Sequence, residues 1–307
     1  MRIAIMGQQA FGKAVLEGFI ARGHTVAGVF VPPEKPGARP DELKVAATER
    51  GLPAHSFKSY SADEASETLR RLETDIGIMA YVTQFIPQAF CLLPPHGTIQ
   101  FHPSLLPLHR GPSAISWAIM QGRAKTGLTI FRPSDGLDEG PVLLRKEVAI
   151  QPDDTLGTIY FDRIFPLGIA ALIEAAEAVV AGTARETAQD ETEATYEGWV
   201  REAESHIDWA THIDRIYDIV RGCNPAPGAS TRWEGRRLQL FDARKSIART
   251  FGAVRGLKLG QVTEVTKQSF TVHAQGGFLE VQRCRIDDGK KIAGGEAGIT
   301  SGTILGA

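Results

Sequence analysis

The chain has 307 residues, of which 43% are hydrophobic and 23% charged, with a formal net charge of −2. This length and composition are those of a globular protein with one large domain or two modest ones. A charge so close to zero excludes a global electrostatic attraction to nucleic acid, although it leaves room for a local basic patch.

Three cysteines, Cys91, Cys223 and Cys284, are widely spaced and form no C-x-x-C pair. We therefore expect reduced thiols, no metal site and no catalytic thiol, since none has an activating base beside it in the sequence. The chain opens directly into a strand-like run and contains no apolar run of membrane-spanning length. These features predict a cytoplasmic protein with no membrane partner.

The first part of the chain alternates strand and helix patterns, which predicts a parallel sheet. Strands are expected at 2–6, 25–31, 53–57 and 75–82, and helices at 11–22, 41–50 and 62–72. The run 75–82 is nearly all apolar, as in a strand buried on both faces. The turn 7–12 has Gln9 where a dinucleotide-binding fingerprint has its middle glycine, so the pattern does not favour NAD.

The next stretch carries the residues that point to chemistry. A strand at 97–101 ends in His102, a helix follows at 113–122, and a second strand at 128–132 runs into Asp135 and Asp138. We therefore expect an imidazole and a carboxylate cluster just beyond the C-terminal ends of two neighbouring strands, where open α/β sheets bind ligands.

An aspartate near a histidine can orient the ring and support its protonated form, which can stabilise an oxyanion or protonate a leaving nitrogen. Gln100 lies two residues before His102, so its carboxamide points to the same face of the strand and could donate to the same oxygen. A structural alternative stays open, because a histidine at a strand end is often a hydrogen-bonded capping residue and Asp-Gly is first of all a turn signal.

The region after 140 begins with an edge-strand pattern at 142–150 and a helical pattern at 155–181. Pro166 predicts a kink or two helices, and Asp153 or Asp154 is the expected N-cap.

Residues 183–194 have the polar composition of a linker. A helix at 211–222 follows, and then short strand patterns at 230–233, 237–242, 260–265, 270–274 and 278–283 predict a small β-barrel. Its basic residues are Arg232, Arg236, Arg237, Arg244 and Lys245. They suit either a nucleic-acid platform or a solvated face, and we favour the solvated face.

Three motifs make the sequence recognisable: His102-Pro-Ser-Leu-Leu-Pro107, Arg110-Gly111 and Asp135-Gly-Leu-Asp138-Glu-Gly140. Together they resemble the signature of the folate-dependent formyltransferases, which include methionyl-tRNA formyltransferase. The sequence is more similar to the N-terminal hydrolase domain of 10-formyltetrahydrofolate dehydrogenase, a resemblance that extends to roughly residue 290. The marks of that branch are at 7–12, 84–87, 152–155, 165–168 and 194–198.

The resemblance implies an α/β fold with a Rossmann-like parallel sheet in a formyltransferase domain at 1–182. It further implies a linker at 183–205 and an OB-like β-barrel domain at 206–307. The implied co-substrate is 10-formyltetrahydrofolate, with no metal and no NAD.

The implied catalytic residues are His102 and Asp138, with Gln100 at the position of a family asparagine. The extra methylene of Gln100 displaces its amide by about a bond length, which weighs more against efficient formyl transfer to an amine than against folate binding. The residues implied to line the pterin pocket are Gln84, Phe85, Ile86, Leu105, Asp135, Gly136 and Leu137. A flat heterocycle suits such apolar faces and polar backbone edges, although Phe85 and Ile86 could equally cap the core.

The resemblance predicts an enzyme that transfers the formyl group of 10-formyltetrahydrofolate to water or an amine and releases tetrahydrofolate. The alternatives are a methionyl-tRNA formyltransferase and a partner-dependent folate-binding module. A tRNA acceptor is not favoured, because the loop 32–40 has only Lys35 and Arg39 where tRNA-acting relatives carry a longer basic insertion. The formyl acceptor therefore stays open.

Overall fold

The computed structural model describes residues 1–34 and 36–306, so Lys35 of the predicted short loop lies outside the described residues. The chain divides into two compact units. Unit 1 consists of Met1–Gly111, Thr126–Val148 and Phe161–Tyr196, and unit 2 of Pro112–Lys125, Ala149–Tyr160 and Glu197–Ala307. The predicted linker 183–205 is thus divided, with 183–196 belonging to unit 1 and 197–205 to unit 2. The predicted domain boundaries stay a prediction.

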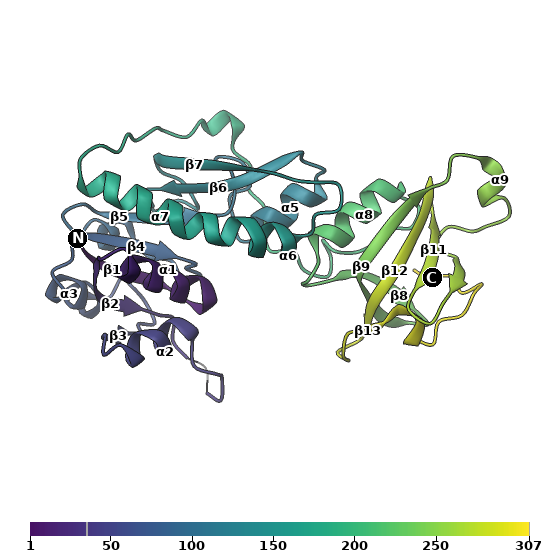
Figure 1. The fold of residues 1–307 in the computed structure, drawn as a ribbon, viewed down its shortest axis with the longest axis horizontal. Coiled ribbons are helices and arrows are strands. Elements are labelled where there is room, and N and C mark those ends of the chain that lie inside the picture. The colour runs from purple at the N-terminus through teal and green to yellow at the C-terminus, as the bar shows by residue number, and fades with distance from the viewer. Residues whose placement is uncertain (35, 307) are drawn as a thin grey trace. The chain divides into compact units, whose positions relative to one another are not determined.

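Unit 1 is built on a seven-stranded sheet with the strand order β3-β2-β1-β4-β5-β6-β7 (Figure 1). The strands are β1 Arg2–Gly7, β2 Thr25–Phe30, β3 Ala54–His55, β4 Ile76–Ala80, β5 Thr98–His102, β6 Lys125–Phe131 and β7 Val142–Ala149. The pairs from β3 to β5 are parallel, as predicted, whereas β5 and β6 are antiparallel. The sheet is therefore mixed, and β7 is an edge strand as expected.

The helices of unit 1 are α1 Gln9–Ala21, α2 Glu42–Glu49, α3 Asp63–Arg71, α4 Gln88–Cys91 and α7 Phe165–Val180. The ring of Phe11 in α1 lies 4.5 Å from that of Phe101 in β5 and 5.3 Å from that of Phe165 in α7. Side chains alternate across a strand, so α1 and α7 cover the Phe101 face of β5 and leave Gln100 and His102 on the other face.

The helical pattern around Pro166 is interrupted, as predicted. A short helix α6, Leu156–Ile159, is followed by a π-helical turn at Tyr160–Ile164 and then by α7. Pro166 lies in the first turn of α7, where a missing N–H removes no intrahelical bond. The predicted N-cap was wrong, because Thr155 caps α6 through a reciprocal capping box with Thr158.

Unit 2 combines helices with an antiparallel sheet. Its helices are α5 Ala114–Met120, α6, α8 Ile213–Gly222 and α9 Phe251–Val254. Its strands are β8 Ala229–Trp233, β9 Arg236–Ile247, β10 Val262–Val265, β11 Phe270–Ala274, β12 Gly277–Ile286 and β13 Ile292–Ala293. They follow the order β10-β11-β12-β9-β8, with β13 on β12. All five predicted strands of this region are present, and the OB-like interpretation of the sheet stays a prediction.

The strand β9 continues beyond its predicted end at Asp242. This residue has a left-handed backbone, with φ of 44°, which interrupts the regular strand geometry. The pairing with β12 nevertheless resumes at Ala243 and reaches Ile247.

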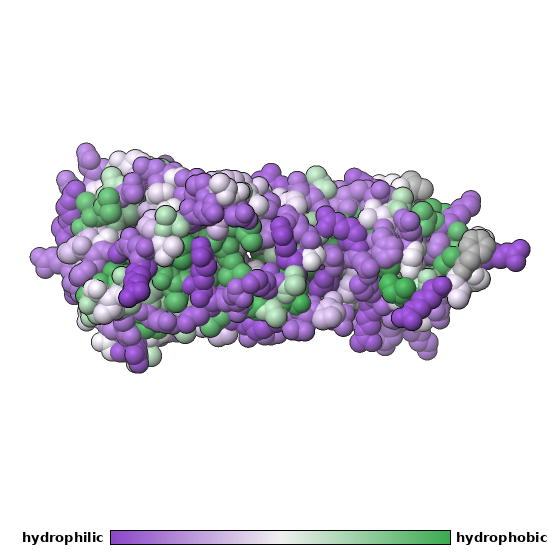
Figure 2. Space-filling view, turned by 90° about the horizontal axis from the view of Figure 1, so that it is seen from above, coloured by the Kyte–Doolittle hydropathy of each residue, from purple (hydrophilic) through white to green (hydrophobic). Residues whose placement is uncertain are grey.

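The exposed surface carries some large hydrophobic side chains. On the face that Figure 2 shows, hydrophilic residues predominate and hydrophobic residues appear between them. Phe85 and Leu137 are among the exposed hydrophobic residues, with 64% and 55% of their surface accessible. No helix in the described part of the chain has the length and apolarity that a membrane crossing requires.

Candidate active site

The centre of the candidate site is the ring of His102, which ends β5 and is only 5% exposed. Its Nε2 lies 2.8 Å from the backbone oxygen of His109. A carbonyl oxygen can only accept, so we assign a proton to Nε2. The other ring nitrogen, Nδ1, lies 3.5 Å from Asp138 Oδ2. The geometry therefore makes Nδ1 the nitrogen that can exchange a proton.

The second component, Asp138, belongs to the loop between β6 and β7. Gln100 pairs with Phe131 and His102 with Thr129 in antiparallel register, so β5 and β6 end at opposite edges of the sheet. His102 and the two aspartates thus follow the ends of two neighbouring strands, as predicted, but these strands run in opposite directions. The loop instead folds back toward β5 and brings Asp138 to His102.

The predicted catalytic residues are brought together by this loop. The Nε2 of Gln100 lies 3.4 Å from Asp138 Oδ1, a long hydrogen bond, and the backbone N–H of Gly111 donates to Asp138 Oδ2 at 2.8 Å. One carboxylate thus meets an amide, an imidazole and a backbone donor. Its side chain is 9% exposed, so these contacts act in surroundings where charge interactions are stronger than in water. The catalytic roles themselves stay a proposal.

Two loops carry exposed groups beside this centre. The N–H of Gln88, the first residue of α4, donates to Asp135 Oδ1 at 2.8 Å and so ties the loop 133–140 to the segment after β4. Phe85 and Leu137, one on each of these segments, are the exposed hydrophobic residues noted above. The N–H of Gly136 donates to Ser134 Oγ at 3.3 Å within the turn.

The other residues predicted for the pocket have contacts within the protein. Ile86 is 4% exposed and belongs to a buried hydrophobic cluster, which is the core role left open by the sequence. The amide of Gln84 donates to the backbone oxygen of Phe57 at 3.1 Å. Leu105 packs on β6, where a Cβ added to Gly127 would lie 2.6 Å from Leu105 Cδ2.

Sequence reasoning gave no role to a set of residues that surround this centre: Arg110, Gln189, Glu191 and Tyr196. The guanidinium of Arg110 is fully buried and pairs with Glu191 and Gln189 at 2.7 and 2.8 Å. The amide of Gln189 in turn donates to the backbone oxygen of Asp138 at 3.0 Å. Arg110 was visible as part of a motif, but its partners lie 79 to 86 residues away in a segment with the composition of a linker.

The three cysteines are buried free thiols. Burial raises the pKa of Cys91 and Cys223 to about 12 and that of Cys284 to about 11, and the nearby Asp135 carboxylate adds to the effect at Cys91. A thiol with so high a pKa is a poor nucleophile near neutral pH, as expected from the sequence.

A metal site was not expected from the sequence. Within residues 1–34 and 36–306, the structure gathers no three His, Cys, Asp or Glu side chains into a potential ligand set for a metal ion. The predictions of no metal and no NAD stay predictions.

Comparison with known proteins shows the family to which the chain belongs. A family model described as formyl transferase matches residues 1–176, and a model for the formyl transferase C-terminal domain matches residues 200–298. The cytosolic 10-formyltetrahydrofolate dehydrogenase of Xenopus laevis is 35% identical over 303 residues, covering 95% of this chain and 33% of that protein. The chain therefore spans about a third of the length of this curated relative.

Two further similar proteins are a methionyl-tRNA formyltransferase and the protein HypX. The methionyl-tRNA formyltransferase of Chloroflexus aggregans is 34% identical over 248 residues, covering 79% of this chain and 80% of that protein. The structure of HypX from Aquifex aeolicus in complex with tetrahydrofolic acid is similar in fold, with a TM-score of 0.69 and 20% identity over 95% of this chain and 46% of HypX. On the family models and these relatives, the chain belongs to the formyl transferase family.

Proposed function

We propose that unit 1 takes 10-formyltetrahydrofolate as a formyl donor, transfers the formyl group to water or an amine, and releases tetrahydrofolate. The observation that carries this proposal is the approach of His102 Nδ1 to the Asp138 carboxylate on the face of β5 that also bears Gln100. The relatives named as formyltetrahydrofolate dehydrogenases and the fold shared with tetrahydrofolate-bound HypX support the choice of folate.

The proposed reaction uses His102 with a proton on each ring nitrogen. Nε2–H stays on the carbonyl of His109, and the substrate lies so that Nδ1–H, which faces Asp138, also reaches the formyl oxygen. A nucleophile attacks the formyl carbon, and Nδ1–H and the amide of Gln100 donate to the oxygen as it gains negative charge. The bond from the formyl carbon to the folate nitrogen then breaks, and that nitrogen takes the proton that Asp138 has accepted from the nucleophile. With water as nucleophile the products are formate and tetrahydrofolate.

The Asp138 carboxylate has two roles in the proposed reaction. It compensates the positive imidazolium of His102, and it can accept a proton from the attacking nucleophile. The N–H of Gly111 fixes Oδ2 while the weaker bond to Gln100 leaves that amide able to turn toward the substrate.

The pterin ring would lie between Phe85 and Leu137. Both are exposed apolar side chains on segments joined by the Asp135–Gln88 hydrogen bond. Burying such surface against a flat ring is favourable, and backbone groups of the 133–140 loop supply the polar edge. Gln84, Leu105 and Ile86 contribute indirectly in this arrangement, by supporting the two segments.

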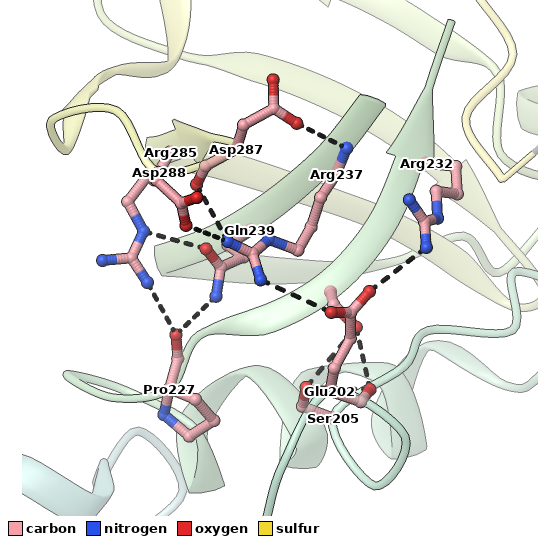
Figure 3. A network of polar contacts seen from close by, with 10 residues as sticks. Glu202, Ser205, Pro227, Arg232, Arg237, Gln239, Arg285, Asp287 and Asp288 are labelled. Carbon is pink, nitrogen blue, oxygen red and sulfur yellow. Dashed lines mark hydrogen bonds and ion pairs between the residues drawn. The ribbon is translucent and has the colours of Figure 1, made fainter. Parts of the chain in front are cut away.

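A tRNA acceptor is the second candidate function, since the match to the methionyl-tRNA formyltransferase of Chloroflexus aggregans covers 80% of that protein. The basic residues of unit 2 argue against it. Arg232 and Arg237 both pair with Glu202, and Arg237 also pairs with Asp288 at 2.5 Å (Figure 3).

Two more of these cations are also paired, Arg236 with Asp287 and Lys245 with Asp214. Cations already neutralised by neighbouring carboxylates contribute less to phosphate binding than free ones. The favoured acceptor is therefore water or a small amine.

The test is the absorbance change as the purified protein converts 10-formyltetrahydrofolate to tetrahydrofolate, in buffer alone, with small amines and with methionyl initiator tRNA. Turnover in buffer alone would identify water as an acceptor. Turnover only with the tRNA would contradict the preference stated here. No turnover under any of these conditions would remove the donor assignment.

A further inference from the structure

Arg110 carries a buried charge, and all the hydrogen-bond donors of its guanidinium are paired. Its side chain has no exposed surface, and each of its five N–H groups has an acceptor. Nε and Nη2 donate to Gln189 Oε1 at 3.2 and 2.8 Å, and Nη1 and Nη2 donate to the Glu191 oxygens at 2.8 and 2.7 Å. Nη1 also donates to the hydroxyl of Tyr196, whose ring centroid lies 5.1 Å from the guanidinium carbon. A buried guanidinium needs such pairing, because an unpaired one is costly to desolvate.

The backbone beside Arg110 contacts both proposed catalytic side chains. The preceding residue, His109, accepts the hydrogen bond from His102 Nε2, and the following residue, Gly111, donates to Asp138 Oδ2. Fixing the Arg110 side chain therefore fixes the carbonyl that sets the His102 tautomer and the N–H that orients the carboxylate. The backbone here needs such fixing, because His109 has a left-handed φ of 57°.

A second connection runs from Arg110 through Gln189. The amide nitrogen of Gln189 donates to the backbone oxygens of Asp138 and Gly140 at 3.0 and 2.9 Å, while its oxygen holds the guanidinium. Asp138 itself has a left-handed φ of 53°, a conformation that is unfavourable for a non-glycine residue. Gln189 thus holds Asp138 in a backbone conformation that it would otherwise tend to leave.

Further contacts join the same partners. The hydroxyl of Tyr196 donates to Glu139 Oε1 at 2.9 Å. The backbone N–H of Arg110 donates to the oxygen of Thr195 at 2.9 Å, and that of His109 to Thr195 Oγ1 at 2.7 Å. The segment 189–196 is therefore attached to the His102 loop and to the Asp138 loop.

We infer that Arg110 and Gln189 are positioning residues for the reaction, and that the segment 189–196 completes the active site by holding His102 and Asp138 in register. This inference rests on the proposed function for its kinetic part only. It assigns a role in turnover to a buried arginine and to residues of the predicted linker that act through the two proposed catalytic side chains. If the network only stabilises the fold, the variants below should lose kcat only to the extent that they lose stability.

The sharpest variant is Gln189→Glu. A carboxylate at 189 still accepts from Arg110, so the buried charge stays paired, but it cannot donate to the two loop carbonyls. We expect kcat to fall about 10- to 100-fold, with KM for the folate within about twofold and an unchanged melting temperature. The matched control is Gln268→Glu, the same change at an exposed position. An unchanged kcat, or a loss that follows the melting temperature, would overturn the inference.

A second measurement is independent of turnover. Nitrogen NMR of the neutral His102 ring should show the Nε2–H tautomer in the wild type and a mixture of tautomers in Arg110→Lys and Gln189→Glu. The matched control for the first variant is Arg22→Lys at an exposed ion pair with Glu177. Identical tautomers in all the proteins would refute the positioning role. A wild type that shows no folate turnover would remove the proposed function, whereas the tautomer comparison would still decide this inference.

Discussion

The ring of His102 and the carbonyl of His109 are joined by a 2.8 Å hydrogen bond that places a proton on Nε2 and leaves Nδ1 facing Asp138. The nitrogen near the backbone is thus occupied by the protein itself. Any proton that the ring exchanges with a substrate must pass through Nδ1.

Replacement of His102 by alanine should reduce kcat for 10-formyltetrahydrofolate about 10²- to 10⁴-fold, because proton transfer and oxyanion stabilisation are both lost. The folate dissociation constant, measured by fluorescence or calorimetry, should change little, since the proposed pterin contacts lie on other segments. A variant with the wild-type rate would exclude His102 from the reaction. The circular dichroism spectrum serves as the control for folding.

Replacement of Gln100 by leucine keeps the side-chain volume and removes the amide donor. We expect kcat to fall about 10²-fold with little change in KM, because the amide donates to the formyl oxygen only as charge develops on it. Single-turnover kinetics would separate this chemical step from folate binding. A rise in KM at constant kcat would instead place Gln100 among the residues that bind the ground state.

Replacement of Phe85 by alanine should weaken folate binding about 10-fold and leave kcat nearly unchanged. The ring is 64% exposed without ligand, so the protein loses little stability when it is removed. Phe161→Ala is the matched control, because that phenyl group is also 59% exposed in unit 1. Equal folate affinities of the two variants, measured by calorimetry, would contradict the proposed pterin wall.

The thiols should be unreactive in the folded protein. With pKa values of about 11 to 12, the cysteines carry thiolate at less than about one part in 10² at pH 8, and all three are buried. A thiol-specific chromogenic reagent should therefore react slowly with the native protein and titrate three thiols after denaturation. Rapid reaction of one thiol in the native state would show that its burial is transient.

The contribution of Glu191 to the thermal stability of the protein should depend on pH. Its hydrogen bond from Arg110 lowers the pKa of this carboxyl below the ordinary value for glutamate. A lowered folded-state pKa gives stability that is present above the unfolded-state pKa and is lost as the pH falls through the folded-state value. The melting temperature of the wild type should exceed that of Glu191→Gln at pH 7, and the two should converge below pH 4.5. A difference that persists at lower pH would mean that the charge of Glu191 is not responsible.

The order of helices and strands in unit 1 was predictable because apolar runs and turn residues recur with clear periods. The residues Gln100, His102 and Asp138 were also predictable as a group, through their motifs. The antiparallel direction of β6 was not, since the side-chain period of a strand is the same in both directions. The sequence alone therefore did not show that the loop after β6 must fold back to bring Asp138 to His102.

The role of Arg110 could not be predicted for a different reason. Hydrogen bonds between residues about 80 positions apart leave no local pattern, and the residues 189–196 are polar enough to suggest a solvated segment. The sequence also could not show which of the neighbours Phe85 and Ile86 is buried. These two adjacent hydrophobic residues lie in one loop, yet Ile86 is buried and Phe85 is exposed. The difference follows from the packing of Ile86 in the cluster that contains Phe30 and Phe90.

The position of Gln189, Glu191 and Tyr196 along the chain has a consequence for making fragments of this protein. A piece that ends at residue 182 would contain the whole seven-stranded sheet and Gln100, His102 and Asp138, yet Arg110 would have lost all three side chains that accept hydrogen bonds from its guanidinium. The shortest N-terminal fragment that keeps these contacts ends at Tyr196. During synthesis, too, the full set of contacts around Arg110 can form only after that residue has left the ribosome.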